Sequence, residues 1–87
     1  MLIIADCGST KCTWVADDGA RTTSVRTRGI NAVQHSAEQI REALAELPPY
    51  GAVTAVRFYG AGGGASFPEA SEKLRRELAA HFGTEEI

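Results

Sequence analysis

Residues 2–16 have the sequence LIIADCGSTKCTWVA, in which a small polar loop separates two apolar runs. The first run, residues 2–5, is short and continuously apolar, as expected of a strand that is buried on both faces. The second run, residues 12–16, is rich in residue types that favour strands. The stretch therefore predicts two neighbouring strands joined by a hairpin.

A third strand is expected over residues 22–28, after a tight turn. The turn is Asp17-Asp18-Gly19, and an Asp-Gly pair supplies the positive φ that a tight hairpin needs. Residues 22–28 are β-branched but polar and contain arginines, which suits the edge of a sheet. Three successive strands with short loops predict an antiparallel meander.

A helix is expected to follow the meander. Ser36 and Gln39 have the spacing of a capping box, so the helix should begin at Ser36. Ile40 and Leu44 lie on one face at helical spacing, and the pair Pro48-Pro49 should end the helix.

The second half of the chain predicts one more strand and one more helix. Residues 52–59 form the expected fourth strand, which the preceding helix should connect as a parallel crossover. Ser66 and Glu69 form a second possible capping box, and Gly83 is a plausible helix end. The order is therefore βββαβα. Residues 84–87 resemble the beginning of a further parallel strand, which suggests a truncated chain.

Composition excludes several classes of protein. The 87 residues include 9 Lys and Arg against 11 Asp and Glu, a net charge of −2, and no basic run that would favour nucleic acid. No segment approaches the ~18 apolar residues of a membrane helix, and the N-terminus does not resemble a signal peptide. A cytoplasmic location is expected. Cys7 and Cys12 could face each other across the hairpin, but in a reducing compartment they are expected to be free.

The hairpin loop has residue types that suit phosphate binding. Gly8 lets a phosphate approach the backbone, and successive N–H groups in a turn can hold an anion. Ser9 and Thr10 add hydroxyl donors, while Lys11 adds a positive charge. Asp6 could hold Mg²⁺ through water. An ordinary polar hairpin has the same composition, so both interpretations stay open.

Three motifs together resemble a known family. The segment from Asp6 to Trp14 is similar to the phosphate-binding hairpin of the actin-like superfamily of sugar kinases and Hsp70 chaperones. More narrowly, it resembles the N-acetylglucosamine kinase-like branch of the BadF/BadG/BcrA/BcrD ATPase family. Gly29-Ile30-Asn31 and Tyr59-Gly60-Ala61-Gly62 match two further motifs of that family, in the same order.

The resemblance implies a ribonuclease-H-like, actin-type half-domain with sheet order 3-2-1-4 and a missing fifth strand. Residues 1–87 would be the truncated N-terminal lobe of an ATP-dependent amino-sugar kinase, with no second domain. The catalytic base would lie beyond Ile87, so the chain alone should be inactive. ATP and Mg²⁺ would be the cofactors of the intact protein, and an amino sugar its substrate.

The resemblance also implies roles for single residues. Asp6 would organise the metal, and the phosphates would be lined by Gly8, Ser9, Thr10 and Lys11. The amino-sugar site would include Asn31, Gly60 and Gly62. Thr13 departs from the family, which usually has Asp there and so has a further charge beside the hairpin.

Other interpretations remain. The chain could belong to an ATPase that activates a partner enzyme, or it could be a non-catalytic assembly module. Gly60-x-Gly62-x-x-Ala65 fits a dinucleotide fingerprint, but an antiparallel meander precedes it, which favours a simple strand-to-helix turn. Trp14 is expected in the core. The strand over residues 52–59 has only Arg57 to protect it as an edge, so self-association through this strand is expected.

Overall fold

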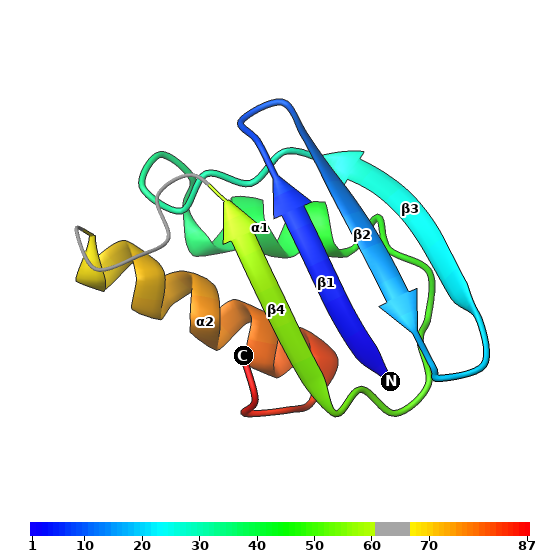
Figure 1. Cartoon of the computed structure of the whole chain (residues 1–87). Helices are drawn as coiled ribbons and strands as arrows, with labels where there is room; N and C mark the ends of the chain where they lie inside the picture. The colour runs from blue at the N-terminus through cyan, green and yellow to red at the C-terminus, as the bar shows by residue number, and fades with distance from the viewer. Residues whose placement is uncertain (61–66) are drawn as a thin grey trace.

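The computed structural model describes residues 1–60 and 67–87, which form one sheet and two helices (Figure 1). The element order is βββαβα, as the sequence predicts. The elements are β1 (Leu2–Cys7), β2 (Lys11–Asp17), β3 (Thr22–Arg28), α1 (Ala37–Leu44), β4 (Ala55–Gly60) and α2 (Pro68–Phe82).

The strand order in the sheet is β3-β2-β1-β4. β1 pairs antiparallel with β2, and β2 pairs antiparallel with β3, so the meander is confirmed. β1 pairs in parallel with β4, as expected of a strand–helix–strand connection. The chain is therefore an α/β domain with a mixed sheet, in the predicted order 3-2-1-4.

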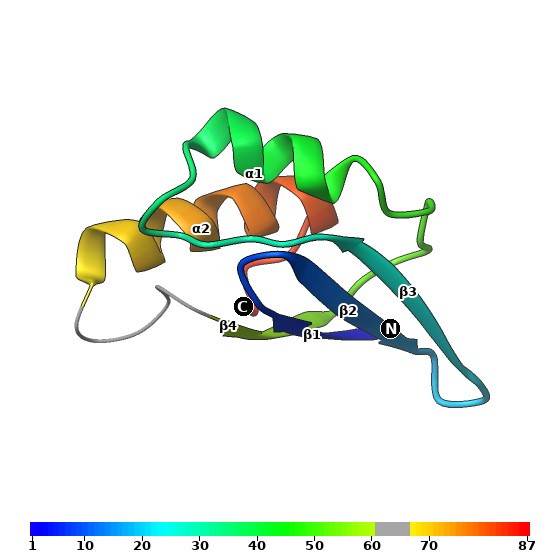
Figure 2. The same cartoon turned by 90° about the horizontal axis from the view of Figure 1, so that it is seen from above.

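Both helices cover the same face of the sheet (Figure 2). Strand residues that point toward the helices alternate with residues that point away, and the first set forms the core. Trp14 is fully buried there, and its indole Nε1 donates a hydrogen bond of 2.9 Å to Thr27 Oγ1. Its ring packs against Phe58 and Phe82. The core position expected for Trp14 is confirmed.

No described helix covers the other face of the sheet. This open face has half-buried apolar residues in its middle, Leu2, Ile4 and Val15. Asp6 lies on the same face, at the carboxyl end of β1, because its neighbours Ala5 and Cys7 point into the core.

The helix ends follow local chemistry, with two differences from prediction. The capping box of α1 is present: Gln39 N donates to Ser36 Oγ at 3.2 Å, and Ser36 N donates to Gln39 Oε1 at 2.8 Å. However, α1 ends at Leu44, before the two prolines. The chain continues in a tighter turn, in which Leu47 N donates to Leu44 O, and this turn still buries Leu47.

The N-cap of the second helix lies one residue after its predicted position. Phe67 occupies the N-cap position of α2 without a side-chain hydrogen bond, and Ser66 lies outside the described residues. At the other end, Gly83 adopts φ 70°, so the predicted glycine cap is confirmed.

The fourth strand is shorter than predicted at its start. It begins at Ala55 rather than at residue 52, because the backbone N and Oγ1 of Thr54 both donate to the carbonyl oxygen of Met1. These bonds tie residue 54 to the first residue of the chain before regular pairing with β1 begins. Apolar residues on both sides of Thr54 hide this boundary in the sequence.

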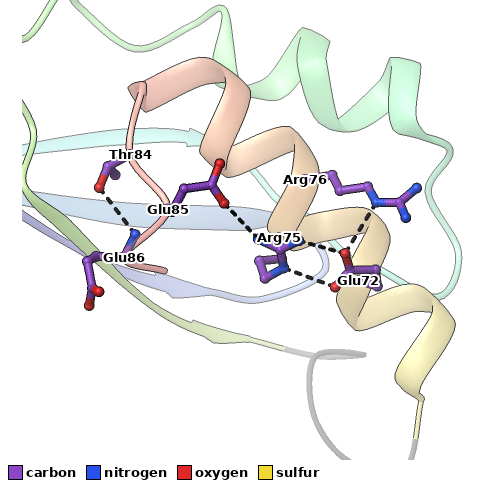
Figure 3. Close-up of polar contacts among 6 residues, drawn as sticks. All are labelled: Glu72, Arg75, Arg76, Thr84, Glu85 and Glu86. Atoms are coloured by element: carbon purple, nitrogen blue, oxygen red, sulfur yellow. Dashed lines mark hydrogen bonds and ion pairs between the residues drawn. The ribbon is translucent and has the colours of Figure 1, made fainter.

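The C-terminal segment, residues 84–87, lies along the free edge of β4. Val56 N donates to Glu86 O at 2.7 Å, and Thr84 Oγ1 donates to Thr54 O at 3.1 Å. Arg75 of α2 is placed between Glu72 and Glu85 and so connects the helix to this segment (Figure 3). The segment begins to pair with β4 where a further strand was expected, although it is not itself a strand.

Within the part of the chain that the structure describes, no helix is long and apolar enough to cross a membrane.

Candidate functional site

The hairpin between β1 and β2 is an exposed loop at the carboxyl end of the central strand. Gly8 N donates to Lys11 O at 2.9 Å and closes the loop, whose residues 8–11 are all exposed. Among residues 1–60 and 67–87, no acceptor receives a hydrogen bond from the backbone N–H or the hydroxyl of Ser9 or Thr10. Four donors at the tip of the loop are therefore available to an anion.

Asp6 and Lys11 place opposite charges on the open face beside this loop. Asp6 is exposed, and its register neighbours are Thr13 on β2 and Tyr59 on β4. Lys11 lies on the same face of β2 as Thr13, two residues away, because side chains alternate along a strand. Neither charge forms an ion pair with any residue of the described chain. Both side chains are thus free to meet a ligand.

Thr13 stands directly opposite Asp6. Thr13 carries no charge, so Asp6 is the only acid of this cross-strand pair. Among the described residues no three acidic, histidine or cysteine side chains gather closely enough to hold a metal ion by themselves. A single carboxylate fits Mg²⁺ that keeps several waters and shares phosphate oxygens, because this ion seldom uses a cage made only of protein.

Gly29 packs against the backbone of the hairpin loop on the helix side of the sheet. It is buried, and a Cβ atom built on it would lie 2.4 Å from Ser9 C and 2.5 Å from Gly8 O. No side chain fits at that distance from backbone atoms. The glycine of the Gly29-Ile30-Asn31 motif is therefore required for the chain to pass beneath the hairpin loop.

Asn31 has a structural role that the sequence did not reveal. Its Oδ1 accepts hydrogen bonds from Val33 N at 3.0 Å and from Gln34 N at 3.2 Å. Its own backbone N donates to His35 Nδ1 at 2.9 Å. The side-chain oxygen therefore shapes the turn before α1, which leaves the Nδ2 amide group without a hydrogen-bond partner among the described residues.

A polar hollow of about 250 Å³ lies between the hairpin and the start of α1. It is lined by Ser9, Thr10, Arg28, Gly29, His35, Gln39 and Glu42. The hollow lies on the helix side of the sheet, whereas Asp6 faces the open side. The structure thus brings the hairpin and the Gly29–Asn31 segment together but separates both from Asp6 by the thickness of the sheet.

The remaining predicted site residues lie at the same end of the sheet. Gly60 ends β4 and is the register partner of Cys7, beside the base of the hairpin (Figure 1). A Cβ atom on Gly60 would lie 2.6 Å from the ring of Phe58 and 3.1 Å from Cys7 O, so packing alone already favours glycine there. Gly62 and the rest of the dinucleotide fingerprint after Gly60 lie outside the described residues.

The two cysteines are joined, contrary to the expectation that they are free. Cys7 and Cys12 are register partners on β1 and β2, their Cα atoms are 4.0 Å apart, and they form a disulfide. The sequence placed them opposite each other, but an assumed reducing compartment argued against the bond. In the structure, the close approach of a pair at the base of a hairpin brings the sulfur atoms together.

Comparison with known proteins adds no identity to this site, because neither a scan against protein-family models nor a search of curated proteins found a match.

Proposed function

We propose that this chain forms the phosphate-binding part of an ATP-dependent amino-sugar kinase, with N-acetylglucosamine as the expected class of substrate. The observation that carries the proposal is the set of unpaired donors at the tip of the hairpin, with the free Lys11 ammonium beside it. Backbone N–H groups, hydroxyls and a lysine are the groups that bind phosphate oxygens without covalent chemistry.

The position of the hairpin in the sheet supports the same function. It follows the central strand β1, whose parallel neighbour β4 ends beside it at Gly60. In open α/β sheets, ligands bind outside the carboxyl ends of the strands. Asp6, at the end of β1, would hold Mg²⁺ through water, and the ion would neutralise charge on the transferring phosphoryl group.

In this proposal, the sugar site has less direct support than the phosphate site. Asn31 offers its Nδ2 group, while its Oδ1 is already bonded to the backbone. The base that accepts the proton of the attacking sugar hydroxyl would be supplied by a segment beyond residue 87. The 87-residue chain is therefore expected to bind Mg·ATP weakly and to transfer no phosphate.

The alternative of an ATPase that activates a partner enzyme has less support. Such a role is expected to involve cysteine ligands for an iron–sulfur cluster at a subunit junction. Both cysteines of this chain are joined to each other and lie in the core, with Cys7 5% exposed and Cys12 fully buried. The other alternative is a non-catalytic assembly module, whose contact surface would be the edge of β4.

The experiment is a titration of the ¹⁵N-labelled chain with Mg·ATP, followed by amide chemical shifts. We expect the largest changes at Ser9, Thr10 and Lys11, and a weaker response at Gly60. Lys11→Ala should weaken binding. Arg21→Ala is the matched control, because it removes an exposed positive charge from the hairpin at the other end of β2. Equal effects of the two variants, or shifts centred elsewhere, would refute the phosphate site.

A further inference from the structure

The disulfide lies at the base of the hairpin whose tip is the phosphate site. Cys7 is the last residue of β1, Cys12 is the second residue of β2, and only residues 8–11 separate them. Residues 1–87 contain two cysteines, so no other thiol among these residues can exchange with the pair. The state of one bond therefore constrains both ends of the loop.

The pair connects the exposed loop to the buried core. Cys7 is 5% exposed and Cys12 is fully buried, whereas every residue of the loop is exposed. A close-packed interior leaves little room for two sulfur atoms to move apart. The hairpin base also has Gly29 packed closely behind it, where a Cβ would lie 2.5 Å from Gly8 O. The exposed tip is the part of the hairpin that can respond most freely.

The redox step itself is a simple exchange. A dithiol reductant gives two electrons and two protons, the S–S bond breaks, two thiols form, and the reductant becomes a disulfide. The two unbonded sulfur atoms then need van der Waals separation instead of bonding distance. Since their Cα atoms are only 4.0 Å apart, the side chains must rotate or the strands must separate.

We propose that Cys7 and Cys12 are a thiol–disulfide switch that sets the affinity of the hairpin loop for phosphate. This inference rests on the proposed function of the loop. The disulfide holds the ends of the loop in place, so the amides of Ser9 and Thr10 are oriented before the ligand arrives. Reduction loosens the loop, and the ligand must then order it, which lowers affinity.

Thermodynamic linkage requires that ligand binding also affect the reduction of the disulfide. If the oxidised form binds Mg·ATP more tightly by some factor, Mg·ATP must make the disulfide harder to reduce by the same factor. A change in the reduction equilibrium on adding nucleotide is a property that a purely structural disulfide, indifferent to the ligand, does not have.

The test compares the oxidised chain with the chain reduced by dithiothreitol, without any substitution. We expect Mg·ATP affinity to fall on the order of threefold or more on reduction. The amide signals of Ser9 and Thr10 should shift, while those of Gly19 and Ala20, in the hairpin at the other end of β2, should stay in place. In glutathione buffers, saturating Mg·ATP should shift the reduction midpoint toward the disulfide by the same factor.

A double variant, Cys7→Ala with Cys12→Ala, should bind Mg·ATP like the reduced chain with or without dithiothreitol. Equal affinity of the oxidised and reduced wild-type chains would overturn the switch, whatever the variant does. If neither form binds Mg·ATP, the proposed function fails. The amide comparison then decides whether the loop conformation responds to reduction. Unchanged Ser9 and Thr10 signals reject the switch, and shifted signals support the coupling between the disulfide and the loop conformation.

Discussion

At the scale of single residues, two glycines of the same site differ in what they do. Gly8 is not required by the hairpin, because a Cβ there would lie 3.7 Å from Lys11 O, an ordinary contact. Gly29 is required, because a Cβ there would meet the backbone of Ser9 at 2.4 Å. Gly8 thus leaves open space beside the loop, which a ligand would occupy in the proposed function. Gly29 leaves space for the backbone of the hairpin itself.

We therefore expect Gly8→Ala to fold normally and to weaken Mg·ATP binding. Its free energy of unfolding should stay within about 1 kcal/mol of the wild type. Gly29→Ala should instead lose about 1–3 kcal/mol, because either the hairpin or the segment after β3 must shift. Urea unfolding measures both values. A large loss in Gly8→Ala would contradict this assignment, as would an unchanged Gly29→Ala.

Asn31 allows a similar separation of folding from binding. Asn31→Ala removes the acceptor for two backbone amides and should lower the free energy of unfolding by about 1–2 kcal/mol. Asn31→Asp keeps an acceptor oxygen and should keep most of that stability, but it loses the Nδ2 donor. In a longer protein with the proposed kinase activity, Asn31→Asp should raise the sugar KM. If Asn31→Asp binds the sugar normally, Asn31 acts only on the turn.

Not all of these roles could be predicted from the sequence. The residue types at positions 6–11 indicate phosphate chemistry because their donors are intrinsic to the side chains and the backbone. The structural roles of Gly29 and Asn31 depend on which segment crosses beneath the hairpin. That crossing is a tertiary contact, which a local sequence pattern does not predict. The bond between Cys7 and Cys12 depends on register, which the short loop predicted, and on redox conditions, which the sequence does not contain.

At the scale of elements, α2 is connected to the C-terminal segment by charges. Glu72 accepts hydrogen bonds from Arg75 and Arg76, and Arg75 also contacts Glu85 (Figure 3). The hydrogen bonds from Arg75, more than its charge alone, lower the pKa of Glu72 from 4.5 to about 2. The network is exposed, so its contribution to stability is small and sensitive to salt.

The lowered pKa gives a pH dependence with a definite sign. A carboxylate whose pKa is lower in the folded state stabilises the fold above its unfolded pKa, and this stabilisation is lost as pH falls. The loss due to Glu72 should therefore occur between about pH 4.5 and pH 2. We expect the Tm of Glu72→Gln to fall less steeply than that of the wild type in this window. Parallel curves would show that the network does not contribute.

The other elements show where pattern and propensity are sufficient. The capping box placed the start of α1 correctly, because that signal is local. The continuous apolar run of residues 2–5 predicted a strand buried on both faces, but this is wrong for the open face, where Leu2 and Ile4 are only half-buried because no described helix covers them. The start of β4 and the end of α1 were misplaced by a few residues, at Thr54 and after Leu44. The hydrogen bonds from Thr54 to Met1 decide where β4 begins, and the tighter turn after Leu44 decides where α1 ends.

At the scale of the whole molecule, the edges of the sheet differ in protection. β3 is a polar edge with arginines, while β4 has Arg57 and an exposed Tyr59. The first part of the β4 edge is occupied, since Val56 N donates to Glu86 O. Because alternate residues of a strand direct their amides to the same side, Phe58 N and Gly60 N also point away from β1.

Self-association through β4 is therefore expected at its carboxyl half, as an antiparallel pair of two copies around a two-fold axis. Tyr59→Lys should shift the chain toward monomer, because Tyr59 is 62% exposed and a lysine there disfavours edge pairing. Val56 is unsuitable for this test, because it is fully buried and a charge there would unfold the domain. Removal of residues 84–87 should act in the opposite direction, since it uncovers the amide of Val56.

Light scattering across a concentration series measures the association of all three chains: the wild type, Tyr59→Lys and the shortened chain. A wild-type chain that stays monomeric up to its solubility limit, or a Tyr59→Lys chain that associates as strongly as the wild type, would show that this edge does not mediate association.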